Sequence, residues 1–339
     1  MTGRRHPARD SKVGSSGPFL PSLAGPSLPS LAGTFLTGVA VTVLTTLAVS
    51  PALAHGGSIG AAGRSSLRLP TWLVLLTGGA AVGASFLLSS FVTDRALIRA
   101  IDGWRRGLPL PNRAATVLGR IVGLAVLAAV LVVGFIGPQS SANLAVLLVW
   151  VGWWAGFTTL TYLVGNAWPV LNPWRTLAEL LPTYGRSYPR WLGTWPAVVG
   201  LLALVWLEVV SPLAAAPAQL ATVVVGYSLV TLAGAAVVGP ADWFRFVDPV
   251  AGVFRNYGRV APIGRDEDGG LELRLPATAL TGPGSISGPG DVAFVVALLW
   301  ATTYDGLVTT PAWTDAIEAL AGIGVPTAVV YPLALLAGF

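Results

Sequence analysis

The sequence predicts an all-α fold, a polytopic transmembrane helix bundle with about seven spanning helices after a cleavable or uncleaved N-terminal leader helix. Three observations lead to this prediction: an apolar composition, apolar segments of membrane-spanning length, and arginines confined to alternate loops. Hydrophobic residues make up 54% of the 339 residues and charged residues only 10%, with a mean hydropathy of +0.71. Soluble domains carry about a quarter charged residues, so this chain has too little polar surface to face water on all sides.

The composition also excludes several kinds of site. The chain has no cysteine, which excludes disulfides, thiolate metal sites and cysteine nucleophiles. Its only histidines are His6 and His55, too few for a multi-histidine metal cage. The net charge of +5 does not indicate a nucleic-acid partner, because the arginines lie between apolar segments, where they orient helices in a bilayer. No GxxxxGK[ST], GxGxxG, HExxH or GxSxG motif occurs.

The first 54 residues are expected to precede the membrane domain, which spans 55–339. Residues 1–33 are basic and rich in Pro and Ser, and they are expected to be disordered. Residues 34–54 form a signal-peptide-like apolar segment that ends in Ala52-Leu53-Ala54, an A-x-A cleavage pattern. Cleavage there would place His55 at the mature N-terminus; an uncleaved first helix is the alternative.

Seven later segments reach or approach the roughly 20 residues that a spanning helix needs. They lie at about 70–92, 116–137, 143–166, 192–211, 218–239, 292–310 and 323–339.

The arginines give these segments an orientation. If His55 lies outside and the helices alternate, the inner segments are 93–115, 167–191 and 240–291, and they contain most of the arginines. The outer segments 138–142, 212–217 and 311–322 contain no Lys or Arg. Only Arg64 and Arg68 fall outside. This distribution follows the positive-inside rule and predicts a protein of the cell (plasma) membrane with its mature N-terminus outside.

Two inner loops each contain an Asx-Pro pair that predicts the start of a helix. Asn172 and Asp248 are N-cap residues, and each is followed by proline at the first helical position. Apolar residues recur at helical spacing after each pair, which predicts surface helices at about 173–181 and 249–259, lying in the inner interface with the aromatic side down. These helices either pack under the bundle without a ligand or form a cytoplasmic gate or partner-docking surface.

Each of these loops precedes a spanning helix with an acid near its outer end, Glu208 in the first and Asp305 in the second. The repeated order would suit a transporter, in which repeats frame a site. Acids in spanning segments usually face water or a partner. Glu208 and Asp305 could therefore reach the headgroup region, or they could gather with Tyr304 and the hydroxyls of Thr302 and Thr303 in an extracytoplasmic polar cluster.

His55 is expected on the same side of the membrane. With a free N-terminal amine, Glu208 and Asp305 it could bind Cu or Zn, whose ligands include imidazole and oxygen. Nothing in the spacing demands a metal, and no cofactor is identified. The alternative is that His55 belongs to a short outer loop.

The inner segment 260–291 contains one strand-like pattern. Leu271, Leu273 and Leu275 alternate with Glu272 and Arg274, which predicts a short, half-exposed strand in a small hairpin over the inner face.

Five stretches carry a resemblance: ALAHGG (52–57), LRLPTWLVLLTGGAAVGASFLLSSFV (67–92), GNAWPVLNPWRTLAEL (165–180), YPRWLGTWPAVVGLLALVWLEVVSP (188–212) and TTYDGLVTTPAW (302–313). Together they resemble a family of multi-pass membrane proteins often labelled fenitrothion hydrolase. The resemblance covers about residues 52–320. It implies a membrane fold and carries over no catalytic residues. Members of that family continue into further C-terminal helices with several histidines, whereas this sequence ends at Phe339 without them.

Two functions are compatible with these features. The first is a non-enzymatic membrane protein, a transporter or a component of a membrane complex, with the lipid bilayer and membrane proteins or further copies of itself as partners. The lack of a catalytic constellation favours it. The alternative is a metal-dependent membrane hydrolase of organophosphate-like apolar substrates that uses a metal-activated water. It would depend on His55, Glu208 and Asp305. Two points count against it: His55 is the single histidine of the mature chain, and catalytic zinc usually needs three protein ligands.

Overall fold

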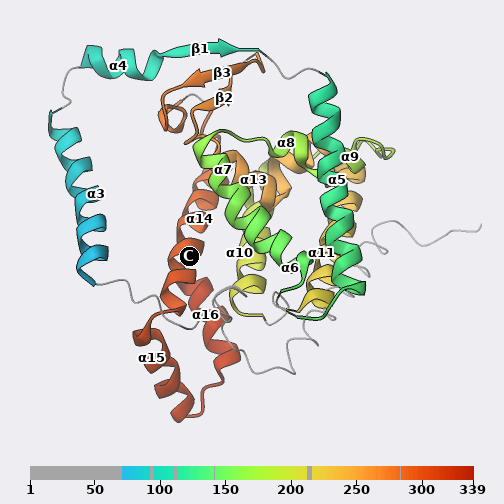
Figure 1. Ribbon diagram of the computed structural model, residues 1–339, viewed down its shortest axis with the longest axis vertical. Helices are drawn as coiled ribbons and strands as arrows, with labels where there is room; N and C mark the ends of the chain where they lie inside the picture. Colours follow the sequence, from blue (N-terminus) through green and yellow to red (C-terminus); the bar gives the residue numbers. More distant parts are fainter. Residues whose placement is uncertain are drawn as a thin grey trace, which may run out of the picture. The chain divides into compact units, whose positions relative to one another are not determined.

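The computed structural model describes residues 71–91, 95–109, 113–140, 142–211, 216–266, 268–282 and 284–339 (Figure 1). The predictions for residues 1–33 and 34–54, and for His55, lie outside the described residues. The described chain is mostly helical, which confirms the all-α prediction at the level of the fold class.

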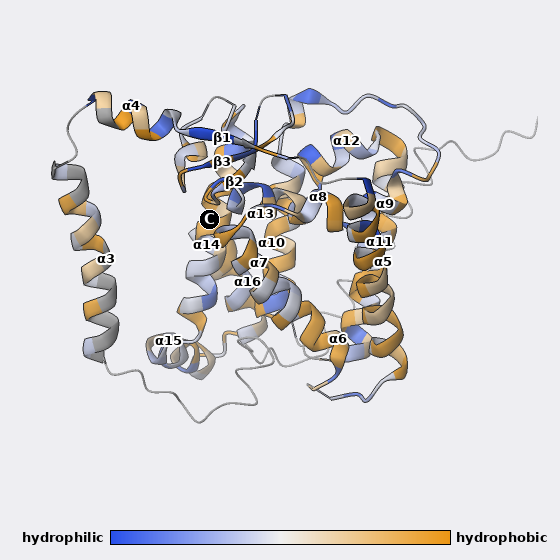
Figure 2. Ribbon diagram, turned by 45° about the horizontal axis from the view of Figure 1, so that its top comes forward, coloured by the Kyte–Doolittle hydropathy of each residue, from blue (hydrophilic) through white to orange (hydrophobic). Residues whose placement is uncertain are grey.

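Four helices of the described residues are long and apolar enough to cross a membrane. They are α5 (Arg113–Ile136), the continuous helix Leu144–Leu163, α11 (Pro217–Val238) and α14 (Pro289–Val308). The continuous helix consists of α6 (Leu144–Leu147), the π-helix η1 (Leu148–Phe157) and α7 (Thr158–Leu163). All four lie at predicted spans, and Figure 2 shows them largely in the colours of hydrophobic residues. The chain is therefore a helical membrane protein.

The count of seven spans is not confirmed. A helix of 21 residues, α3 (Thr71–Phe91), occupies the first predicted span. The spans predicted at 192–211 and 323–339 are apolar helices of only 15 and 12 residues, α10 (Trp195–Val209) and α16 (Thr327–Gly338). The first of these begins late, because the short 3-10 helix η2 (Arg190–Leu192) precedes it and Gly193 adopts a φ of +49°. An apolar run therefore overestimates the length of helix that forms.

The segment 311–322, predicted as an outer loop, is a helix, α15 (Pro311–Gly322). The sequence signal is a capping residue followed by proline, as at Asn172 and Asp248. Thr310 precedes Pro311, and its hydroxyl accepts a hydrogen bond from the backbone N–H of Trp313 at 3.2 Å.

The two predicted surface helices form at the expected N-caps but end earlier, as α9 (Pro173–Ala178) and α13 (Pro249–Tyr257). The Asn172 side chain accepts from the N–H of Arg175 at 3.0 Å, and Asp248 accepts from the N–H of Ala251 at 2.6 Å. Short helices precede both caps: α8 (Trp168–Leu171) before the first, and α12 (Pro240–Asp242) with the π-helix η4 (Trp243–Val247) before the second.

Helix α13 is buried in the interior of the protein. Phe254 is fully buried and Val253 is 1% exposed. The helix packs against α7, α10 and α14, and a Cβ on Gly252 would meet the ring of Phe294 at 2.6 Å. The apolar face of α13 is therefore covered by protein, as in the alternative that these helices pack under the bundle.

A three-stranded antiparallel sheet joins distant parts of the chain, in the order β1 (Arg105–Leu108), β3 (Leu271–Arg274), β2 (Ile263–Arg265). The hairpin of β2 and β3 was predicted, whereas β1 was not. The expected exposure is reversed: Glu272 and Arg274 are 5% and 7% exposed, while the leucines between them are half-buried. The polar face is buried because Glu272 pairs with Arg105 at 2.7 Å and with Arg274 at 3.6 Å.

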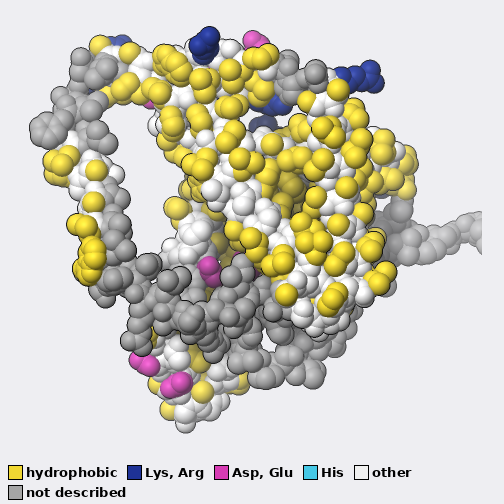
Figure 3. Space-filling model, viewed as in Figure 1, with side chains coloured by type: hydrophobic (Ala, Val, Ile, Leu, Met, Phe, Trp, Pro, Cys, Tyr) yellow, Lys and Arg dark blue, Asp and Glu magenta, His cyan; other side chains and the backbone are white. Residues whose placement is uncertain are grey.

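Charged side chains are unevenly distributed over the visible face. In Figure 3 the dark blue Lys and Arg side chains lie at the end of the view that holds β1 to β3 and α9, and acidic side chains lie over α15 at the other end.

Candidate functional site

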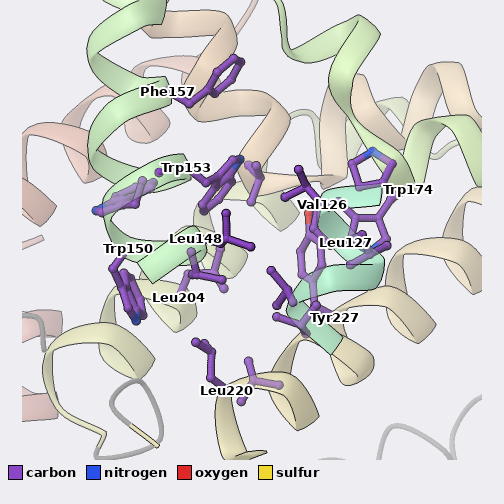
Figure 4. A pocket seen from close by; sticks show the side chains of 18 of the residues that line it. Val126, Leu127, Leu148, Trp150, Trp153, Phe157, Trp174, Leu204, Leu220 and Tyr227 are labelled. Carbon is purple, nitrogen blue, oxygen red and sulfur yellow. The ribbon is translucent and has the colours of Figure 1, made fainter. Parts of the chain in front are cut away.

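A cavity of about 410 Å³ lies inside the bundle, between α5, η1, α8, α10, α11 and α13. Its size falls in the range of sites that hold small molecules. Figure 4 shows aliphatic side chains from three helices pointing into it, among them Val126, Leu204 and Leu220. Figure 3 shows a hollow lined with hydrophobic side chains between α7 and α5. Because the cavity is almost entirely apolar, it suits a molecule that prefers lipid to water.

Aromatic rings form much of the wall. The ring centroid of Trp153 lies 5.7 Å from that of Trp168 and 5.5 Å from that of Phe254, and Phe157 lies 4.8 Å from Phe254. Trp174 meets Tyr227 edge to face at 4.8 Å. Tilted and edge-on pairs of this kind are favourable beyond the area that they bury, so the rings stabilise the wall of the cavity.

The π-helix η1 supplies two of these rings, those of Trp153 and Phe157, from adjacent turns. The sequence LVWVGWWAGF from Leu148 to Phe157 places Trp150, Trp153 and Phe157 on the cavity side. A π-helix is rare and is frequently found at functional sites, because the wider turn redirects side chains and loosens the backbone ladder. Its position in the cavity wall is therefore a structural sign of function that hydropathy alone does not reveal.

Two indole N–H groups in the wall have no hydrogen-bond partner among the described residues. They are the Nε1 atoms of Trp153 and Trp168, and Trp168 is 5% exposed. A buried donor without an acceptor costs on the order of 1–3 kcal/mol. By contrast, Trp174 Nε1 donates to Ser228 Oγ at 2.7 Å. Both unpartnered nitrogen atoms are buried, so these donors lie within the wall and not on the surface of the cavity.

A polar pair lies at the wall of the cavity. Tyr227 of α11 lines the cavity and donates its hydroxyl hydrogen to Asp248 Oδ2 at 2.5 Å. Asp248 is 1% exposed, and its other oxygen caps α13. Burial raises the pKa of Asp248 to about 6, although the hydrogen bonds from Tyr227 and from the backbone of Ala251 lower it in part. This carboxyl group therefore titrates near physiological pH.

Of the predicted polar cluster of Glu208, Tyr304 and Asp305, the structure brings the two acids near each other. Glu208 is partly buried and is the only carboxylate among the described residues that line the cavity. Asp305 of α14 is exposed but close enough to act electrostatically on Glu208. Tyr304 is fully buried and donates to the Tyr331 carbonyl oxygen at 2.8 Å.

The neighbouring hydroxyls do not join a site. Thr302 and Thr303 each donate to the Leu299 carbonyl oxygen within α14, at 2.9 and 2.8 Å. No group of three His, Asp or Glu side chains in the described part of the chain is arranged to hold a metal ion. His55 lies outside that part, so the Cu or Zn site stays a prediction.

Most of the residues that line the cavity were not predicted from the sequence. Trp153, Trp168 and Tyr227 were not singled out, because aromatic residues in apolar runs are typical of any membrane helix. The available signal was the density of Trp and Gly in residues 148–157. Asn172 and Asp248 were found as caps, but only the fold shows that Asp248 borders the cavity wall.

The fold and the site thus define a helical membrane protein with an apolar cavity inside its bundle. Comparisons with protein families, with curated proteins and with solved structures find no match to this chain. The resemblance to the family labelled fenitrothion hydrolase therefore stays a prediction that rests on the quoted stretches of sequence.

Proposed function

We propose that this protein is a membrane transporter whose substrate is a largely apolar molecule bound in the cavity between α5, η1, α10 and α11. The cavity carries the proposal: it holds about 410 Å³ between helices of membrane-spanning length and contains one carboxylate, Glu208, in an apolar wall. Transporters bind their substrates inside the membrane at helix interfaces, and intramembrane acids often couple transport to protons. We place the protein in the cell membrane, and its association with further membrane proteins or copies of itself stays a prediction.

Binding can be tested separately from transport. Leu204 points into the cavity, whereas Leu299 of α14 is 65% exposed. Leu204→Phe narrows the cavity and Leu299→Phe is a matched control on another apolar helix. With 2-bromonaphthalene as the probe, we expect saturable quenching of tryptophan fluorescence in the wild type and in Leu299→Phe. Leu204→Phe should show only the linear quenching of partition into the detergent micelle. Linear quenching in the wild type would reject the cavity as a binding site.

Transport is tested in proteoliposomes loaded with a fluorescent apolar cation or acid, with a pH gradient of either sign. We expect Glu208→Gln to lose the pH-dependent component of flux, because its side chain lies in the cavity wall. Asp305→Asn, which removes an exposed carboxylate, should weaken it less. Wild-type flux in both variants would reject the role of these acids.

The orientation proposed from the arginines can be tested by cysteine labelling, because the chain has no cysteine of its own. Ser140→Cys lies in a predicted outer segment and Arg186→Cys in a predicted inner one. A membrane-impermeant maleimide added to intact cells should label Ser140→Cys and should label Arg186→Cys only after lysis. The reverse pattern would invert the topology.

A further inference from the structure

A second pocket, separate from the apolar cavity, lies at the sheet. It has a volume of about 510 Å³ and is lined by polar groups, above all by four arginines. They come from all three strands and from the end of α13: Arg105, Arg265, Arg274 and Arg259. Figure 2 shows this region in hydrophilic colours at the end of the bundle helices.

Three acids share the pocket with the four arginines, namely Asp266, Asp268 and Glu272, and the fold engages two of them. Glu272 pairs with Arg105 and Arg274, and Asp266 Oδ1 accepts from the N–H of Gly270 at 2.6 Å in the turn between β2 and β3. Two arginines, Arg259 and Arg265, form no ion pair with any described residue. Arg259 donates instead to Asn256 Oδ1 at 3.0 Å, and Arg265 donates to the Gly269 carbonyl oxygen at 2.8 Å. Four arginines against three acids leave the pocket with an excess of positive charge that an anion could balance.

The guanidinium groups are also partly dehydrated and close enough to repel one another. Burial lowers the pKa of Arg274; the charge of Glu272 opposes this shift, and the charge of Arg105 adds to it. Burial likewise lowers the pKa of Arg259; the charge of Asp291 opposes this shift, and the charges of Arg245 and Arg274 add to it. An anion between the arginines would relieve this repulsion, and guanidinium groups match the geometry of phosphate oxygens particularly well.

The helix before β1 indicates where such an anion comes from. In α4 (Arg95–Gly103) the charged residues Arg95 and Arg99 alternate with Ile98 and Ile101, which are each 38% exposed. Trp104 follows, 46% exposed, and β1 begins at the next residue. An amphipathic, arginine-bearing helix that ends in an exposed Trp is typical of a helix lying in the membrane interface. The pocket is then at the level of the lipid headgroups.

We propose that this pocket binds the phosphate group of an anionic lipid, with Arg259 and Arg265 as its principal ligands. Arg105 and Arg274 hold the pocket open through Glu272 and through the backbone, since Arg274 donates to the Gly258 carbonyl oxygen at 3.0 Å. The site lies on the inner side of the membrane in the proposed orientation, where anionic headgroups attract basic residues.

The test compares two double variants with the same loss of charge in nanodiscs. Arg259→Gln/Arg265→Gln removes the proposed ligands, while Arg113→Gln/Arg186→Gln removes two arginines that do not line the pocket. Native mass spectrometry measures retained phosphatidylglycerol, and the thermal unfolding midpoint is compared between phosphatidylglycerol and phosphatidylcholine nanodiscs. We expect the pocket variant to bind phosphatidylglycerol roughly 30-fold more weakly and to lose most of the stabilisation, and the control variant to keep it.

Equal losses in the two double variants would overturn the proposal, because general surface charge would then explain lipid binding. A separate arm adds inorganic phosphate to the wild type in phosphatidylcholine nanodiscs. If phosphate alone reproduces the stabilisation at millimolar concentration, the lipid assignment is overturned. No effect of free phosphate, together with the loss in the pocket variant, supports it.

Discussion

The hydroxyl group of Tyr227 donates a hydrogen bond of 2.5 Å to the carboxylate of Asp248, which in turn caps α13. This contact joins α11, a helix of membrane-spanning length, to the buried helix α13, which also lines the cavity. Because α13 packs on α8 and α10, the pair connects α11 to other elements that form the cavity wall. Four predictions test this arrangement and the packing around it.

Removal of the Tyr227 hydroxyl should destabilise the protein. In Tyr227→Phe, Asp248 stays buried but loses a donor, which costs on the order of 1–3 kcal/mol. The matched control is Tyr184→Phe, because Tyr184 is 75% exposed. Thermal unfolding in detergent should show a lower midpoint for Tyr227→Phe alone. Equal midpoints in the two variants would mean that the contact does not stabilise the fold.

The titration of Asp248 should make part of the stability depend on pH. Its pKa in the folded protein is about 6, against 3.8 for an ordinary aspartate, because of burial. The folded state therefore takes up the proton first as the pH falls, so the contribution of this group to stability increases from pH 7 to pH 5, by about 1 kcal/mol. Above pH 7 the contribution is lost.

Asp248→Asn keeps an N-cap side chain but cannot titrate. We expect the unfolding midpoint of the wild type to rise relative to that of Asp248→Asn as the pH is lowered from 7 to 5. Parallel pH profiles for the two proteins would show that the carboxyl group is not buried as described.

The close approach of α5 and α8 at Gly123 should not tolerate a methyl group. A Cβ at Gly123 would lie 1.9 Å from the Leu171 carbonyl oxygen, so Gly123→Ala must separate backbones. We expect a loss of about 1–3 kcal/mol or more. Gly226→Ala on α11 meets nothing within 4 Å and should be neutral or stabilising by up to about 1 kcal/mol. Chemical denaturation in detergent distinguishes them, and equal stability would contradict the packing of α8 on α5.

The buried ion pair of the sheet should matter more than an exposed one. Glu272→Gln leaves the guanidinium of Arg274, which is 7% exposed, without its charge partner, and we expect a loss of about 3 kcal/mol. Glu179→Gln removes an equally charged residue that pairs with Arg120 and Arg175, but its side chain is 31% exposed, so the expected loss is below about 1 kcal/mol. Similar losses, measured by unfolding midpoint, would contradict the burial of the sheet's polar face.

Features that depend only on neighbouring residues were predicted reliably from short stretches of sequence. The four long apolar helices and the caps at Asn172 and Asp248 were predicted, because hydropathy and capping depend on neighbouring residues. The lengths of α10 and α16 were overestimated, because hydropathy does not register the turns at Gly193 before α10 and at Gly324 before α16.

Contacts between distant residues were not predictable in the same way. The exposure of β3 was reversed, because Glu272 finds Arg105, 167 residues away, as a partner. The polar cluster was predicted from three residues near one membrane face, but Tyr304 points instead to α16, which sequence spacing does not reveal.

By itself, therefore, the sequence determined that this is a helical membrane protein, because composition and periodicity decide which segments can leave water. The tertiary structure decided which of its residues form a site. The cavity exists because rings from η1 and α8 meet side chains of α5, α10 and α11, and that meeting depends on helix packing rather than on the hydropathy of any one segment.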